Sequence, residues 1–142
     1  MVNPTMRKFG YPDTLVREFD HWAVLVRPAQ VTLGSLVLAS TSDATAYSEL
    51  PAEAFAEQGQ VVREVESALR EFCNYERINY LMLMMVDPHV HFHVIPRYSA
   101  SRRWEGTAFQ DGGWPCPPQL KIAVELDSDQ VSRMRTQLKR LF

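Results

Sequence analysis

The segment 89–97, with the sequence HVHFHVIPR, constrains the fold of this chain more than any other feature. Histidines alternate in it with apolar residues, and in a β-strand residues two apart project from the same face. A strand here therefore places three imidazoles on one face, those of His89, His91 and His93, and directs the valines and the phenylalanine between them into a core. A merely solvated face would more simply use Thr, Lys or Glu, so three histidines at this spacing indicate chemistry.

Runs of β-branched and aromatic residues predict strands on both sides of one long helix. The expected strands lie at 15–19, 22–27, 34–39, 78–86 and 89–97, with a further one at 121–126. After the third strand the apolar period changes to seven residues, and Pro51 suits a first helical turn. Phe55, Val62 and Leu69 fall on one stripe of this helix, which we expect to run for about six turns across a sheet. This order of elements predicts an α+β fold with an antiparallel sheet.

The C-terminal part predicts a loop followed by a helix. The segment 111–118, DGGWPCPP, is rich in Gly and Pro and predicts a loop. Asp127 is a candidate N-cap for a final amphipathic helix. Trp104, Phe109 and Trp114 surround the loop and either cover a cleft or pack against the final helix, and packing is our preferred interpretation.

Length and charge exclude several classes of protein. The 142 residues, 46% of them hydrophobic, suffice for one domain and are too few for two. A net charge of −2 provides no basic field for a nucleic-acid backbone or an anionic membrane. The longest strongly apolar run, 81–86, is far shorter than the roughly 20 residues of a membrane span, and the first ten residues lack the apolar stretch of a signal peptide. We therefore expect one domain over 1–142, soluble and cytoplasmic, without nucleic-acid or membrane partners.

Metal-binding patterns are weak in this chain. Cys73 and Cys116 stand in unrelated contexts without CxxC spacing, which predicts neither a disulfide framework nor a thiolate site. A strand rises about 3.3 Å per residue, so the first and third histidines of the row lie roughly 13 Å apart, too far for one metal ion to bind all three readily. His21, Asp87 and Glu105 show no ligand spacing. A metal-dependent enzyme that uses two of the three histidines stays a lesser alternative, and we expect no resident metal or other cofactor.

A row of histidines suits nucleophilic attack on phosphorus. Near pH 7 a neutral imidazole keeps one nitrogen lone pair free, and a backbone carbonyl can hold the other ring N–H and so fix the tautomer. The middle residue, His91, is the candidate nucleophile. The flanking His89 and His93 are candidates for contacts with the phosphate oxygens and the leaving group, and in their protonated form they can balance charge or supply a proton.

The motif His-φ-His-φ-His-φ-φ, together with the strands and helix before it, resembles the histidine triad (HIT) superfamily of nucleotide hydrolases and transferases. The resemblance covers roughly residues 9–98 and leaves 99–142 as a C-terminal loop, strand and helix extension. It implies an antiparallel sheet of about five strands with a crossing helix, a homodimer, and a purine nucleotide bound beside the histidine strand. It also implies that His91 forms a nucleotidyl intermediate with help from His89 and His93. A histidine at the third position is similar to the hydrolase branches, because transferase branches commonly carry Gln there.

The implied substrates are nucleoside phosphoramidates, dinucleoside polyphosphates and related nucleotide esters, but the chain departs from the family pattern. Ser35 stands where the family usually has a fourth histidine, and Arg27 stands where an acidic or amide residue usually contacts the ribose. Only VDP separates the last two strands, so the family's phosphate-binding loop is absent. We predict Ser35, Arg27 and Arg97 as substrate-binding residues, with solvated surface as the alternative for Arg97. A nucleotide-binding module without turnover is the alternative function.

Two alternating sets of residues compete for the histidine face of the strand at 78–86. They are Leu81, Leu83 and Met85 in one register and Tyr80, Met82 and Met84 in the other. Pro88 cannot adopt a positive φ, which excludes a tight type I′ turn over Asp87 and Pro88. The sequence therefore leaves the register of this hairpin open.

Overall fold

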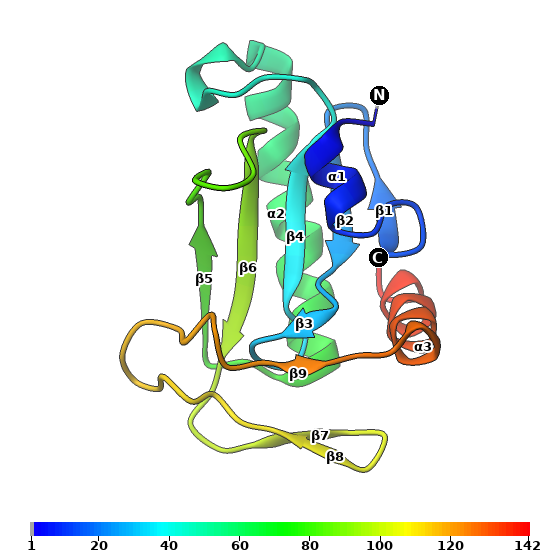
Figure 1. The fold of residues 1–142 in the computed structure, drawn as a ribbon, viewed down its shortest axis with the longest axis vertical. Coiled ribbons are helices and arrows are strands. Elements are labelled where there is room, and N and C mark those ends of the chain that lie inside the picture. Colours follow the sequence, from blue (N-terminus) through cyan, green and yellow to red (C-terminus); the bar gives the residue numbers. More distant parts are fainter. Residues whose placement is uncertain (1) are drawn as a thin grey trace.

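The centre of the protein is a five-stranded antiparallel sheet in the order β1-β2-β4-β6-β5, as seen in a computed structural model that describes residues 2–142 (Figure 1). Its strands are β1 Leu15–Glu18, β2 Trp22–Val26, β4 Leu36–Ser40, β5 Arg77–Leu81 and β6 His91–Arg97. The first three form the expected meander, and β6 pairs with β4. The predicted α+β fold with about five antiparallel strands is confirmed.

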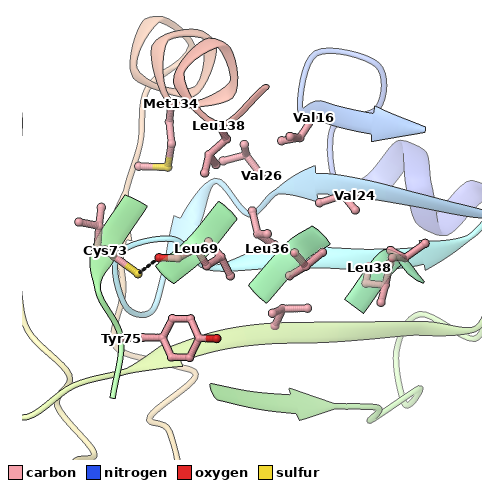
Figure 2. Packing of buried hydrophobic residues seen from close by; sticks show 14 of the residues in the cluster. Val16, Val24, Val26, Leu36, Leu38, Leu69, Cys73, Tyr75, Met134 and Leu138 are labelled. Atoms are coloured by element: carbon pink, nitrogen blue, oxygen red, sulfur yellow. Dashed lines mark hydrogen bonds between the residues drawn. The ribbon is translucent and has the colours of Figure 1, made fainter. Parts of the chain in front are cut away.

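Helices cover both faces of this sheet. Helix α2, Ala52–Cys73, crosses one face over 22 residues, as its seven-residue repeat predicted, and begins just after Pro51 as N-cap. The main core lies between α2 and the sheet, where Leu69 packs with Leu36 and its neighbours (Figure 2). The C-terminal helix α3, Ser128–Lys139, adds buried residues to the same cluster. The short helix α1, Pro4–Lys8, lies over the opposite face, where Met6 packs on small and branched residues of β2 and β4.

Some short elements were not predicted from the sequence. They are α1, the strand β3 Ala29–Gln30 and the hairpin of β7 Arg102–Trp104 and β8 Thr107–Phe109. Helix α1 has only five residues, too few to show an apolar period. The strand expected at 121–126 is reduced to β9, Val124–Glu125, because it pairs with the two-residue β3. Segment 111–118 contains neither helix nor strand, so the predicted loop is confirmed.

The hairpin that carries the histidines has a longer connection than expected. Strand β5 ends at Leu81, which pairs with His93 and so lies on the histidine face. Tyr80 lies on the α2 face, where its hydroxyl donates to a carboxylate oxygen of Glu66 at 2.7 Å. Residues 82–90 then form a loop, because the left-handed backbone of Met84, at φ 50°, breaks the extended chain. The expectation that only VDP separates the two strands was wrong.

The aromatic residues near the C-terminal loop belong mainly to the packing of the fold. The indole N–H of Trp104 donates to the side-chain oxygen of Gln137 in α3 at 2.8 Å, and Phe109 is fully buried in the main core. The preferred interpretation is confirmed for Trp104, Phe109 shares the main core cluster with residues of α3, and Trp114 is half-buried outside both core clusters. Asp127 is the N-cap of α3, as predicted, and forms a capping box with Gln130. Within residues 2–142 no helix has the length and hydropathy that a membrane span requires.

Candidate active site

A pocket of about 420 Å³ opens beside β6 on the face of the sheet that α1 covers. His91 and His93 line it together with Phe9, which follows α1, and Arg27, which follows β2. The loop 82–90 supplies much of the remaining wall. The structure therefore brings two of the three predicted histidines and one of the predicted substrate-binding arginines into one cavity.

His91 has one ring nitrogen committed to the backbone and one left over. The imidazole is 2% exposed, and its Nδ1 lies 2.7 Å from the carbonyl oxygen of His89. Because a carbonyl oxygen can only accept, Nδ1 carries the proton, and Nε2 keeps its lone pair in the neutral ring. This is the tautomer that a nucleophilic imidazole requires.

His93 is held as a neutral ring by its surroundings. The side chain is 8% exposed, and its Nδ1 has no hydrogen-bond partner among the described residues. Burial lowers the pKa of His93 to about 4, and the nearby charge of Arg27 acts in the same direction. The ring of Phe9 packs 5.6 Å from the ring of His91 and 5.7 Å from that of His93, measured between centroids. The imidazole of His93 therefore offers hydrogen bonding near pH 7 without a positive charge.

Strand β6 begins at His91, two residues later than predicted, so His89 stands just before the strand. The side chain of His89 is half-buried. Its Nδ1 lies 2.9 Å from the hydroxyl oxygen of Thr5 in α1. Because α1 covers the same face as His91 and His93, the three imidazoles lie on one side of the sheet, although His89 does not line the pocket. Within residues 2–142 no three His, Cys, Asp or Glu side chains converge as metal ligands would.

Charged side chains meet at the pocket from three parts of the chain. Arg27 donates from Nη1 to the carbonyl of Ala29 at 2.5 Å, while its Nε has no partner among the described residues. The ammonium of Lys8 lies 2.8 Å from a carboxylate oxygen of Asp87 and joins α1 to the loop 82–90. Two cations against one carboxylate make the pocket suitable for an anionic ligand.

Ser35 does not reach the pocket, contrary to the prediction of a substrate contact. It is fully buried in the turn before β4, directly after Gly34, whose φ of 92° favours glycine. The hydroxyl of Ser35 donates to the carbonyl of Thr32 at 2.7 Å and accepts from the N–H of Thr32 at 3.1 Å. Both hydrogen bonds close the turn. The hydroxyl of Ser35 is therefore used to stabilise the backbone and does not face the pocket.

Arg97 also lies away from the pocket, and it is buried and not the solvated surface residue of the alternative interpretation. It is 4% exposed and forms a bidentate ion pair with Asp111 at 2.6 and 3.0 Å. Its remaining N–H groups donate to the side chain of Asn79 and to the carbonyl of Cys116. Arg97 thereby attaches the loop 111–118 to the sheet, and the sequence does not reveal this because the partners lie in separate segments.

The pocket contains residues that were not predicted from the sequence. They are Lys8, Phe9, Leu120 and the apolar side chains 83–86 of the loop after β5. Asn3 followed by Pro4 is a recognisable start of a helix, and in the structure Asn3 caps α1. That signal was sufficient to find the helix, but not to place it over the histidines.

Comparison with known proteins relates the chain to one family. The model of the HIT domain family matches residues 9–100. Curated protein sequences contain no significant match. Among solved structures, a histidine triad protein from Bradyrhizobium japonicum is 19% identical with a TM-score of 0.73, over 99% of this chain and 96% of that one.

Two further structures have the same fold. A histidine triad (HIT) protein from Sinorhizobium meliloti is 17% identical with a TM-score of 0.76, and the match covers 100% of this chain and 96% of that one. A diadenosine triphosphate hydrolase from Plasmodium falciparum is 12% identical with a TM-score of 0.66, and the match covers 91% and 76% of the two chains. Similarity at these identities shows a shared fold and leaves the activity to be argued from the site.

Proposed function

Because the chain belongs to the HIT domain family, we propose that it is a nucleotide hydrolase that transfers a nucleotidyl group first to His91 and then to water. The proposed substrates are nucleotide phosphoesters, nucleoside phosphoramidates and dinucleoside polyphosphates. The observation that supports this proposal most directly is the 2.7 Å contact of His91 Nδ1 with the carbonyl of His89, since it leaves the Nε2 lone pair free for attack.

The pocket supplies the other groups that such a transfer needs. In the first step the Nε2 lone pair of His91 bonds to phosphorus, and the bond from phosphorus to the leaving group breaks with its electron pair going to the departing atom. Arg27 and Lys8 provide positive charge for the phosphate oxygens. The neutral ring of His93 can donate a hydrogen bond to the same oxygens. Water then displaces the nucleotidyl group from His91.

The remaining parts of the proposal follow from family membership. We propose a purine nucleotide as the bound group, a homodimer as the assembled form and the cytoplasm as the location. A histidine at the third position of the row, His93, supports a hydrolase and not a transferase. A structure of the same fold is named a diadenosine triphosphate hydrolase, which is consistent with a dinucleoside polyphosphate as one substrate.

The test is intact mass of the wild-type protein and of His91→Ala after brief incubation with an adenosine phosphoramidate and, separately, with a diadenosine polyphosphate. We expect AMP release and an adenylate adduct in the wild type, and binding without either in His91→Ala. His21→Ala is the matched control, because His21 lies in the turn between β1 and β2 and does not line the pocket.

Other outcomes of this experiment would each support a different interpretation of the function. AMP release by His91→Ala at the wild-type rate would contradict the covalent route. Saturable binding without AMP release by the wild type would favour a nucleotide-binding module without turnover. Loss of AMP release after treatment with a chelator, restored by added zinc, would favour the metal-dependent alternative.

A further inference from the structure

The charged side chains that line the pocket are Lys8, Arg27 and Asp87. Burial lowers the pKa of His93 to about 4, and His91 acts as a neutral ring in the proposed reaction. Two cations against one carboxylate therefore leave the pocket with a net charge of +1. The Nε of Arg27 is buried and has no partner among the described residues, so this guanidinium keeps a donor for a ligand. Lys8, in contrast, is already paired with Asp87.

The two partners of this ion pair are held differently. The ammonium of Lys8 lies 2.8 Å from the carboxylate of Asp87, and their side chains are 54% and 18% exposed. Lys8 ends helix α1, which Asn3 attaches to the sheet by donating to two backbone carbonyls at and just after the end of β4, at 3.0 and 2.8 Å. Asp87 follows Met85 and Val86, which are 86% and 81% exposed, so little packing fixes this part of the loop after β5. The carboxylate is therefore the partner that can give way when a phosphate approaches Lys8.

The charge of the bound phosphate changes during the proposed reaction. A nucleoside phosphoramidate or phosphoester carries one negative charge on the group that is attacked. When water displaces the nucleotidyl group from His91, one water proton passes to solvent, the other stays on the new phosphate oxygen, and the pair of the phosphorus–nitrogen bond returns to Nε2. The monophosphate ionises again with a pKa of about 6, so it carries about two negative charges above pH 7. A pocket with a net charge of +1 matches the substrate, and one with a net charge of +2 would match the product.

We propose that Asp87 is a specificity-determining residue that makes the pocket favour the singly charged substrate over the doubly charged product, an inference that rests on the hydrolase function proposed above. Coulomb energy scales with the product of the charges, so one carboxylate repels a dianion about twice as strongly as a monoanion at the same place. The carboxylate competes with the phosphate for the ammonium of Lys8, and Asp87 regains this partner when the product leaves. The ion pair thereby favours release of the monophosphate after each turnover.

Three ligands with the same nucleoside and different charges test the role of Asp87. They are adenosine, the methyl ester of AMP and AMP, which carry zero, one and about two negative charges at pH 8. Methoxide is too poor a leaving group for turnover during a calorimetric titration, so the titration measures Kd. We expect Asp87→Asn to tighten binding of AMP about 10-fold and of the methyl ester about threefold, and to leave adenosine within about 1.5-fold. The gain for AMP should shrink in 1 M NaCl, where the Debye length is about 3 Å.

Kinetics with an adenosine 5′-phosphoramidate relate this binding to turnover. For Asp87→Asn we expect the inhibition constant of AMP to fall about 10-fold and KM to fall about threefold. Lys8→Met leaves the pocket without net charge and should weaken AMP binding about 10-fold. The double variant Lys8→Met with Asp87→Asn has the wild-type net charge of the pocket, and it should bind AMP within about threefold of the wild type.

Control variants separate the charge of Asp87 from a general change in the protein. Glu105→Gln is the matched control, since it removes the carboxylate of another ion pair, with Arg133, and does not line the pocket. It should leave all three Kd values unchanged. Thermal unfolding checks that each variant is folded, and Asp87→Ser removes the same charge if Asp87→Asn does not fold.

Two results would overturn the inference. Weaker binding of all three ligands to a folded Asp87→Asn, adenosine included, would show that the carboxylate contacts the nucleoside or shapes its wall. Equal tightening of AMP and its methyl ester would show that Asp87 does not discriminate by charge. Charge-dependent binding without AMP release by the wild type would contradict the hydrolase function alone, and absence of AMP binding in every variant would contradict both proposals.

Discussion

The ion pair of Arg97 allows a quantitative test of whether this buried charge stabilises the fold or binds a phosphate. Arg97→Met keeps much of the side-chain volume but leaves the carboxylate of Asp111, which is 1% exposed, without its bidentate partner. It also removes the donors to Asn79 and to the carbonyl of Cys116. Removal of one partner from a buried ion pair costs about 3–5 kcal/mol, so we expect the free energy of unfolding to fall by that amount.

Urea and thermal unfolding measure this loss. For a chain of this size 1 kcal/mol corresponds to roughly 3–4 °C, so the midpoint Tm should fall by about 10–20 °C. The double variant Arg97→Met with Asp111→Leu removes both charges and should recover most of the loss, because no uncompensated charge stays buried. Arg133→Met is the matched surface control, since Arg133 pairs with Glu105 in solvent and should contribute less than about 1 kcal/mol.

Nucleotide binding decides between the structural role of Arg97 and the phosphate contact that the sequence suggested. At temperatures well below the lowered Tm of Arg97→Met, the pocket keeps its lining residues His91, His93 and Arg27. We therefore expect KM to change by less than about threefold. Leu120 follows the loop that Arg97 attaches and lines the pocket, which accounts for a change of that size. Wild-type stability of Arg97→Met combined with strongly weakened nucleotide binding would refute this reasoning.

Two remaining predictions concern His93 and Ser35. Folding lowers the pKa of His93 from 6.5 to about 4, so the unfolded chain binds more protons between these values and stability falls as the pH drops through this window. By linkage the free energy of unfolding at pH 4 falls by about 3 kcal/mol. Urea unfolding of His93→Gln should lack this pH-dependent loss. An identical pH dependence of stability in the wild type and in His93→Gln would be inconsistent with a buried neutral ring. Ser35→His should cost about 2–4 kcal/mol, because the imidazole does not fit the buried turn and both hydroxyl bonds are lost. Faster AMP release from Ser35→His at unchanged stability would show that this side chain reaches the pocket after all.

Local patterns in the sequence were enough to predict the class of fold and the arrangement of the histidines. The alternation in 89–97 required a strand with two unlike faces, and the seven-residue repeat after Pro51 required a long amphipathic helix. Both patterns report on residues that are neighbours within one element, where the period of the backbone decides which side chains share a face. For the same reason the N-cap at Asp127 was predictable, whereas the five-residue α1 was too short to show a period.

Contacts between distant segments were decided by the tertiary structure alone. Arg97 meets Asp111 and Asn79, Thr5 meets His89 across 84 positions of sequence, and the loop 82–90 forms a wall of the pocket. Nothing in the local sequence around Arg97 distinguishes an arginine that binds a phosphate from one that is neutralised by a buried carboxylate. A side chain acquires its pKa, its partners and its access to a ligand from the elements packed around it, and these are brought together only when the chain folds.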